Sequence, residues 1–177
     1  MSTINGKPAE DWISENSPEI GVFRAYWTED GFGISLEDTG YGLRYEWYYK
    51  DGKRVDGVSK GWYPNGQIKT INTYKDGKLD GLWTGWYETI QKMDERTFKE
   101  GKLDGLSTGW YSDGQKKWEY TYKDGKEDGV YTIWYENGQK ESERTYKEGK
   151  LDGLRTGWYE NGEKILEKTY KDGYLIK

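Results

Sequence analysis

Residues 105–128 read GLSTGWYSDGQKKWEYTYKDGKED, and this stretch is one copy of a unit that the chain repeats. The pattern returns every 24 residues, in units that span 57–80, 81–104, 105–128, 129–152 and 153–176. Threonine holds repeat position 17 in every unit, and an aromatic residue follows it each time. A fixed period of this length is typical of repeat proteins, in which neighbouring units build a continuous core together.

Each unit contains two turn signals. The first is an Asn-Gly or Asp-Gly pair such as Asn65-Gly66, and the second is an Asp-Gly or Glu-Gly pair such as Asp124-Gly125. Both central residues of a type I′ turn need a positive φ, which Asn, Asp and Gly tolerate best. The sequence therefore predicts tight type I′ hairpins at both places and about ten antiparallel strands over 57–176. The second unit has Thr89-Ile90 instead of the first pair, so we expect a different turn there.

These signals predict an all-β fold, an elongated single-layer antiparallel meander of tandem β-hairpin repeats. Residues 1–20 are expected to form a polar N-terminal segment, and 57–176 contain the five repeats. Residues 21–56 resemble one degenerate unit with a longer turn. We predict that they cap the array, because the terminal units of repeat proteins are usually atypical.

Composition narrows the functional classes. Hydrophobic residues make up only 33% of the chain and aromatic residues 17%, which favours a thin structure packed by Trp and Tyr. A net charge of −5 argues against binding to nucleic acid or to an anionic membrane. There is no Cys and no apolar N-terminal stretch typical of a signal peptide, and we expect a cytoplasmic protein.

Hairpin register assigns side chains to two faces of the sheet. Face one is predicted to contain the Leu or Val of position 2, the Thr of positions 4 and 17 and the Trp of position 6. Face two is predicted to contain the glycines of positions 1 and 5, the Tyr of positions 7 and 18 and the Leu of position 23. The aromatic residue of position 18 should lie directly across from the glycine of position 1, an arrangement that stabilises sheets.

The sequence offers little for catalysis. His and Cys are absent, so the commonest general base and several metal ligands are missing. The carboxylates of position 15 recur in the units as Glu95, Glu119, Glu143 and Glu167, which is typical of a solvated strand face. Acid pairs such as Asp76 and Asp80 have a spacing that suggests calcium, but neighbouring lysines oppose a cation and the turn explains the acids. We therefore expect no enzyme, no metal site and no cofactor.

Two stretches point to a known family. Residues 81–87, GLWTGWY, and 122–129, YKDGKEDG, resemble the bacterial variant of the MORN (membrane occupation and recognition nexus) repeat. The resemblance covers 57–176 and, more loosely, 21–56. It implies a twisted single-layer sheet of hairpins and a role as a protein-interaction scaffold. Some bacterial members are labelled antitoxins of toxin–antitoxin pairs, and the eukaryotic type is linked to membranes and phosphoinositides. The acidic balance of this chain argues against lipid binding.

Bulky residues that break the repeat pattern on face two are the candidates for partner binding. Constant residues serve the repeat itself, whereas Trp, Tyr and Arg dominate interface hot spots. Register predicts cross-strand pairs of Trp118 with Tyr131, Tyr131 with Arg144, and Trp83 with Arg96. The alternative is that these residues only thicken the sheet locally. The candidates are Trp83, Tyr131 and Arg155 at position 3, Trp118 at position 14, and Arg96, Tyr120 and Arg144 at position 16.

The function that these features favour is a non-catalytic repeat scaffold that binds a protein partner, an antitoxin being one such case. One alternative is a small-ligand or glycan-binding module, because the Thr-Gly-Trp-Tyr motif also resembles choline-binding repeats, which cage a cation with aromatic rings. Another is a self-assembling structural protein, because open sheet edges can pair with a second copy into a homo-oligomer.

Overall fold

The computed structural model describes residues 3–4, 7–8, 20–27, 34–35, 43–50, 53–54 and 56–177, with side chains at 45, 46 and from 56 onward. The chain divides into two compact units, residues 1–90 and 91–177, and each is described by itself. The predictions of a polar segment over 1–20 and of a capping repeat over 21–56 fall largely outside the described residues, and they stay predictions.

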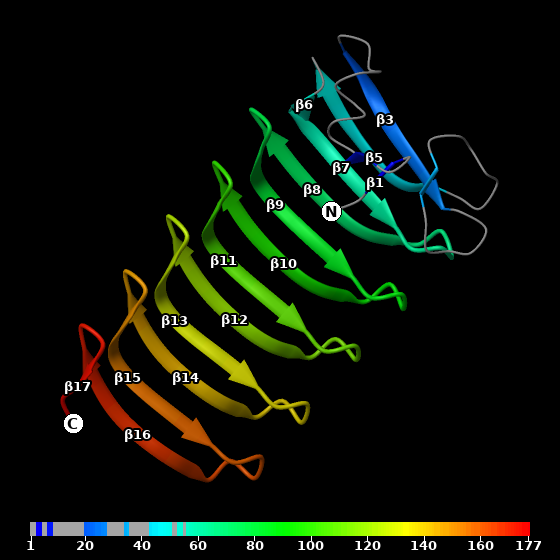
Figure 1. Cartoon of the computed structure of the whole chain (residues 1–177). Helices are drawn as coiled ribbons and strands as arrows, with labels where there is room; N and C mark the ends of the chain where they lie inside the picture. Colours follow the sequence, from blue (N-terminus) through cyan, green and yellow to red (C-terminus); the bar gives the residue numbers. More distant parts are fainter. Residues whose placement is uncertain are drawn as a thin grey trace. The chain divides into compact units, whose positions relative to one another are not determined.

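The first unit contains two antiparallel ladders. A short one pairs β1 with β2, and the larger one has the order β9-β8-β7-β5-β3-β4, with β6 paired to β5 (Figure 1). The strands are β1 (Thr3–Ile4), β2 (Lys7–Pro8), β3 (Ile20–Trp27), β4 (Ile34–Ser35), β5 (Leu43–Lys50), β6 (Lys53–Arg54), β7 (Gly57–Trp62), β8 (Ile68–Lys75) and β9 (Lys78–Trp86).

The second compact unit, residues 91–177, is a meander in which each strand pairs antiparallel with the next one along the chain. Its strands lie side by side in one layer, joined by hairpins at both ends (Figure 1). The all-β prediction of repeated hairpins is confirmed, and the strands predicted over 57–176 are β7 to β16. The strands of this unit are β10 (Lys92–Lys99), β11 (Lys102–Trp110), β12 (Lys116–Lys123), β13 (Lys126–Trp134), β14 (Lys140–Lys147), β15 (Lys150–Trp158), β16 (Lys164–Lys171) and β17 (Tyr174–Leu175).

The two kinds of hairpin differ in turn type. At the Asp-Gly pairs both central residues have positive φ, 51° at Asp124 and 84° at Gly125, which confirms type I′ turns there. At Asn65-Gly66 only the glycine has positive φ, at 82°, so the type I′ prediction is wrong for this hairpin. The Gly66 N–H donates to the Tyr63 carbonyl, and the Tyr63 N–H donates to the Gln67 carbonyl. This is a type I turn followed by a glycine bulge, the usual three-residue hairpin.

The repeat at 81–104 keeps this turn, although a different turn was predicted for it. The Ile90 N–H donates to the Tyr87 carbonyl at 3.1 Å, as Gly66 does to Tyr63. Ile90 has a φ of 68°, so it adopts the left-handed conformation that glycine adopts in the sister turns. A β-branched residue in this conformation is strained, because its branched Cβ crowds the backbone.

Bulges change the register between successive repeats. Tyr120 pairs with Tyr131 and Tyr122 pairs with Glu127, so β13 has two more residues than β12 between these pairs. Gly129 lies in this bulge with a φ of 127° and pairs on its other side with Tyr146, as predicted for positions 1 and 18. Because a shift of two residues preserves the alternation of side chains, the faces remain as predicted while the partners change.

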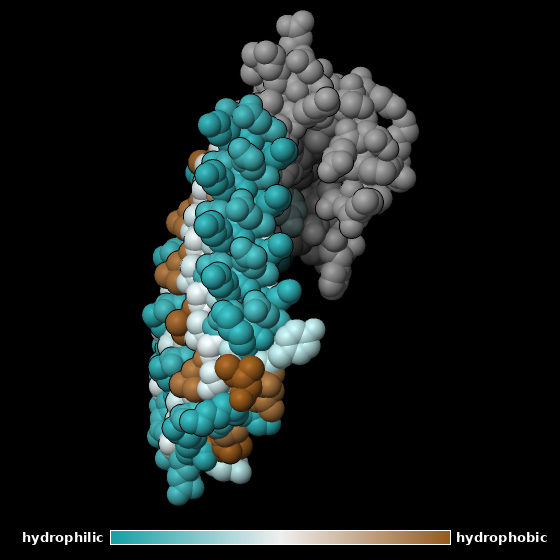
Figure 2. Space-filling view, turned by 90° about the vertical axis from the view of Figure 1, so that its left-hand side faces the viewer, coloured by the Kyte–Doolittle hydropathy of each residue, from teal (hydrophilic) through white to brown (hydrophobic). Residues whose placement is uncertain are grey.

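The buried core is thin and polar. Position 4 is buried in the units where it is Thr, with Thr84, Thr108, Thr132 and Thr156 only 4–6% exposed. On face one the lysine of position 12 lies over the Trp of the next repeat, as Lys116 does over Trp134. The same lysine forms an ion pair with the glutamate of position 15, as Lys116 does with Glu119. Position 2 remains open, with Leu106 52% exposed. Hydrophilic residues cover most of the visible surface, beside a narrow hydrophobic band (Figure 2).

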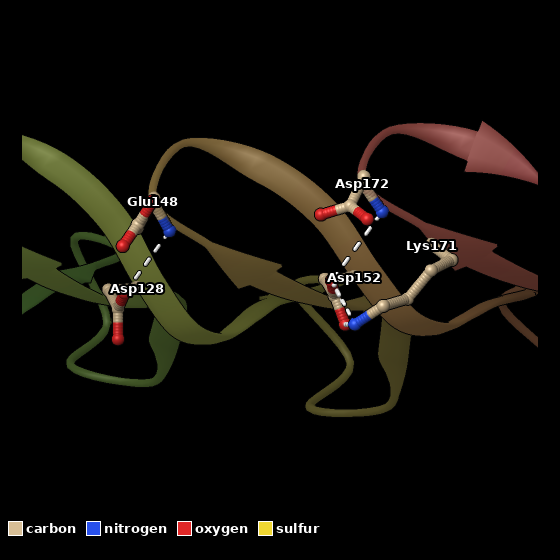
Figure 3. A network of polar contacts seen from close by, with 5 residues as sticks. All are labelled: Asp128, Glu148, Asp152, Lys171 and Asp172. Carbon is tan, nitrogen blue, oxygen red and sulfur yellow. Dashed lines mark hydrogen bonds and ion pairs between the residues drawn. The ribbon is translucent and has the colours of Figure 1, made fainter.

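Adjacent repeats are tied together at both ends of the strands. At one end the hydroxyl of Tyr111 donates to the carbonyl of Trp134 at 2.7 Å, and equivalent bonds recur along the chain. At the other end the backbone N–H of Asp172 donates to the carboxylate of Asp152, which also binds Lys171 at 2.9 Å (Figure 3). The hydrogen bond from Lys171 lowers the pKa of Asp152. The acids near these turns are therefore engaged in closing the next hairpin.

Candidate partner-binding face

One row of side chains on face two crosses the second unit from strand to strand. We call it the central row, and each of its members is directly paired with the next. It contains positions 3 and 16 of the repeat, where the bulky departures from the pattern were found. The central row consists of Arg96, Ser107, Tyr120, Tyr131, Arg144, Arg155 and Lys168, one residue from each of β10 to β16.

Aromatic rings stack in the middle of this row. The rings of Trp118 and Tyr120 are 4.6 Å apart and those of Tyr120 and Tyr131 are 4.0 Å apart, both nearly parallel. Arg96 lies over the Trp118 ring at 5.7 Å, and Arg144 lies over the Tyr131 ring at 5.5 Å. We call these five residues the arginine–aromatic stack. Stacked rings and cation–π contacts of this kind stabilise one another beyond the area that they bury.

The predicted cross-strand pairs have mixed outcomes. Tyr131 does pair with Arg144, as expected. Trp118 does not pair with Tyr131 but with Ile133, because the bulge at Gly129 moves β13 by two residues and brings Tyr120 opposite Tyr131. Trp83 pairs with Asn72 within the first unit. Its predicted pairing with Arg96 would join the two compact units, 1–90 and 91–177, and stays a prediction.

A glycine positions the Trp118 ring. Gly109 lies directly opposite Trp118, and a Cβ added to it would come within 2.2 Å of the Trp118 ring. Trp118 can therefore lie against the sheet only because position 5 has no side chain.

A buried acid lies beside the stack. Asp94 is only 5% exposed, and its Oδ2 binds the Arg96 guanidinium at 2.7 Å. Burial raises the pKa of Asp94, while the nearby Arg96 acts to lower it. Among the described residues neither Asp94 Oδ1 nor the Oγ of Ser107, which is 2% exposed, has a hydrogen-bond partner. Sequence reasoning did not find Asp94, although it departs from the pattern at the same repeat position as Trp118.

Tyr120 and Tyr122 keep their protons. Burial, followed by a hydrogen bond with Tyr131, raises the pKa of Tyr120 well above its usual range. Burial also raises the pKa of Tyr122, whose ring meets Tyr120 edge-on at 6.3 Å. The centre of face two is therefore an apolar platform with hydroxyl groups that stay protonated at physiological pH.

Comparison with known proteins supports the repeat assignment. A family model described as "MORN repeat variant" matches residues 55–76, 127–148 and 151–172. The matches begin 72 and 24 residues apart, which are multiples of the 24-residue period (127 − 55 = 72; 151 − 127 = 24). These three stretches match the MORN repeat of the variant type. Each matched MORN repeat corresponds to one hairpin with its three-residue turn, such as β13 with β14.

A curated protein is similar to part of this chain. A protein of Aquifex aeolicus (strain VF5), named only "Uncharacterized protein", is 32% identical over 65 residues, which is 37% of this chain. The chain spans about a quarter of that relative's length, the aligned share being 23%.

The matched repeats contain only half of the candidate face. Tyr131 and Arg144 lie in the repeat at 127–148, and Arg155 and Lys168 lie in the repeat at 151–172. Arg96, Trp118 and Tyr120 lie outside the matched residues. Lys168 was missed from the sequence because lysine is common in the MORN repeats, although it shares position 16 with Arg96 and Arg144.

Among the described residues, no group of three or more acidic side chains is placed to hold a metal ion. In that same part of the chain, no helix has the length and apolarity to cross a membrane.

Proposed function

We propose that this chain is a non-catalytic MORN-repeat scaffold that binds a protein partner through face two of its second unit. The observation that supports this most directly is the arginine–aromatic stack. Its members, Arg96, Trp118, Tyr120, Tyr131 and Arg144, occupy positions that hold the smaller polar residues Ser59, Thr70 and Asn72 in the first repeat. The members of the stack belong to the three residue types that dominate protein interfaces.

The stack is organised as a binding surface would be. Its rings are held by Gly109 below and by guanidinium groups at both ends, so little side-chain entropy remains to be lost on binding. All five side chains are half-buried, which leaves part of each ring or guanidinium accessible. A toxin bound by its antitoxin is one kind of complex that such a surface suits.

A comparison of the two faces tests this proposal. The face-two variant combines Trp118→Ser with Tyr131→Ser. The matched control combines Leu106→Ser with Leu154→Ser, two residues of face one that are 52% and 45% exposed. Both variants are first checked by circular dichroism and thermal unfolding to remain folded. Each is then used as bait in a lysate of the source organism, and the captured proteins are quantified by mass spectrometry.

The expected result is that the native chain and the face-one control retain the same protein and the face-two variant loses it. Equal retention by all three baits would remove face two from consideration. Loss by the face-one control alone would move the binding surface to the exposed Leu and Val row.

A further inference from the structure

Three cations stand in line at the C-terminal end of the central row. Arg144 pairs directly with Arg155, and Arg155 pairs directly with Lys168. They come from three adjacent strands, β14, β15 and β16, which are spaced at about 4.8 Å, so the row spans roughly 10 Å. Like charges directly opposite one another destabilise a sheet. The repeat does not require cations here, because the same positions hold Ser59 and Asn72 in the repeat at 57–80.

Three of the five other basic side chains on these strands have acidic partners. Lys140 and Lys164 on face one pair with Glu143 and Glu167, and Lys171 pairs with Asp152. In contrast, Arg144, Arg155 and Lys168 form no ion pair with any residue that the structure describes. Within the described part of the chain, the one hydrogen bond from these three side chains is from Arg144 Nε to the hydroxyl of Ser142 at 3.1 Å.

This lack of partners is notable in an acidic chain. The sequence has 32 acidic and 27 basic residues, so carboxylates are in excess. They are nevertheless placed on face one and at the turns, where they pair with lysines and backbone N–H groups. The three cations are therefore a local positive strip whose neutralising charge is not supplied by its own strands.

A row of mostly small residues runs beside the strip. Its members on the same strands are Ser142, Gly157 and Leu166, which pair in succession and continue from Ile133 and Trp118. A ligand over this area would meet cations on one side and, on the other, small residues followed by Leu166.

We propose that the strip formed by Arg144, Arg155 and Lys168 binds an extended acidic segment of the partner protein. In an extended peptide, side chains on one side recur at roughly 6.8 Å, so carboxylates at alternate residues can reach successive members of the strip. Guanidinium groups accept carboxylates in a two-pronged geometry, which favours such a ligand over a neutral one. This inference rests on the proposed function and specifies the chemistry of the partner.

A peptide is favoured over a nucleic acid because of the long-range field. A chain with a net charge of −5 repels a polyanion that extends beyond the strip, whereas a short acidic segment needs only local neutralisation. Binding should therefore weaken as salt rises, because the three cations are half-buried or exposed rather than deeply enclosed.

The test uses a defined probe and a charge-matched control. The probe is a fluorescein-labelled peptide of about twelve residues that alternates Glu and Thr, and its control has Gln in place of Glu. The strip variant combines Arg155→Gln with Lys168→Gln. The control variant combines Lys140→Gln with Lys164→Gln on face one, so both variants change the net charge equally. Binding to the full chain is measured by fluorescence anisotropy, and folding is checked by thermal unfolding.

We expect the Glu peptide to bind the native chain and the face-one control alike, and the strip variant about tenfold more weakly. The Gln peptide should bind none of the three. Equal weakening in both variants, or no binding of the Glu peptide up to about 1 mM, would overturn the inference. Tighter binding of a labelled single-stranded oligonucleotide, lost in the strip variant, would also overturn it. The proposed function is tested separately, because the pull-down with Trp118→Ser and Tyr131→Ser leaves in place Arg155 and Lys168, the two cations that the strip variant removes.

Discussion

The ring of Trp118 occupies the space that a side chain on Gly109 would fill. An added Cβ would lie 2.2 Å from Trp118 Cε2, far inside van der Waals contact. The equivalent glycine two repeats later, Gly157, faces Leu166, and a Cβ there would meet Leu166 Cγ at an ordinary 3.4 Å. Neither glycine has a positive φ, so the difference between the two sites is one of space rather than of backbone conformation.

Gly109→Ala should therefore destabilise the protein by about 1–3 kcal/mol, the usual cost of overpacking, while Gly157→Ala should change stability by less than about 1 kcal/mol. Urea unfolding followed by circular dichroism measures both. The Gly109 variant should also change the tryptophan fluorescence, because the ring has to move away from the sheet. Equal losses of stability in the two variants would contradict this account of the Trp118 position.

Ile90 offers the opposite test, because here a glycine is missing. Its φ of 68° strains a β-branched residue, and its side chain is 68% exposed, so little packing is lost by removing it. Ile90→Gly should stabilise the protein by about 1 kcal/mol. The matched change in the other direction is Gly66→Ala, since Gly66 has a φ of 82° with no atom within 4 Å of an added Cβ. That variant should be destabilised by a similar amount in the same unfolding assay.

Such opposite shifts would show that the backbone conformation alone determines the effect. A loss of stability in Ile90→Gly would mean that the Ile90 side chain makes a contribution larger than its strain.

Much of the fold could be predicted from the repeat, because turn chemistry is local. The Asp124-Gly125 pair predicts a type I′ turn through the φ that these two residues tolerate, and the structure has this turn. The Asn65-Gly66 pair is compatible both with a type I′ turn and with a type I turn followed by a glycine bulge. In the structure the Gln67 N–H donates to Asn65 Oδ1 at 3.0 Å, a contact that the pair itself does not specify.

The candidate site was less predictable, because a bulge is a departure from regular pairing. From the sequence, Gly129 is compatible with regular pairing under a cross-strand ring and with a bulge of positive φ. The structure has the bulge, so Trp118 pairs with Ile133 instead of Tyr131. The predicted set of residues on face two is unchanged, because a register shift of two residues keeps each side chain on the same face. Asp94 and Lys168 were missed because an acid and a lysine are common along this chain; cross-strand pairing places Asp94 opposite Gly109 and Lys168 opposite Arg155.

Tyr122 and Lys123 are neighbours in sequence with different surroundings. Tyr122 is half-buried against Tyr120 and pairs with Gly105, whereas Lys123 is exposed beside the type I′ turn. We expect Tyr122→Ala to destabilise the protein by about 2–4 kcal/mol and Lys123→Ala by less than about 0.5 kcal/mol. Thermal unfolding of both variants checks this, and equal shifts would argue against the assignment of Tyr122 to a packed face.

Asp94 should give the protein a pH-dependent stability that an amide cannot. Its pKa in the folded chain is raised by burial above its ordinary value, despite the opposing effect of Arg96. The folded state therefore holds the proton more tightly than the unfolded state, and the free energy of unfolding falls as pH rises between the two pKa values, from about pH 4 upward. Asp94→Asn removes this term, so the stability of the variant relative to the native chain should increase across that window and then level off. Urea unfolding at a series of pH values measures the difference, and Asp94→Ser, which introduces the residue found at position 14 in the fourth repeat, should show the same trend. A difference that stays constant with pH would show that Asp94 titrates alike in the folded and unfolded chains, and that its burial beside the arginine–aromatic stack has no electrostatic cost.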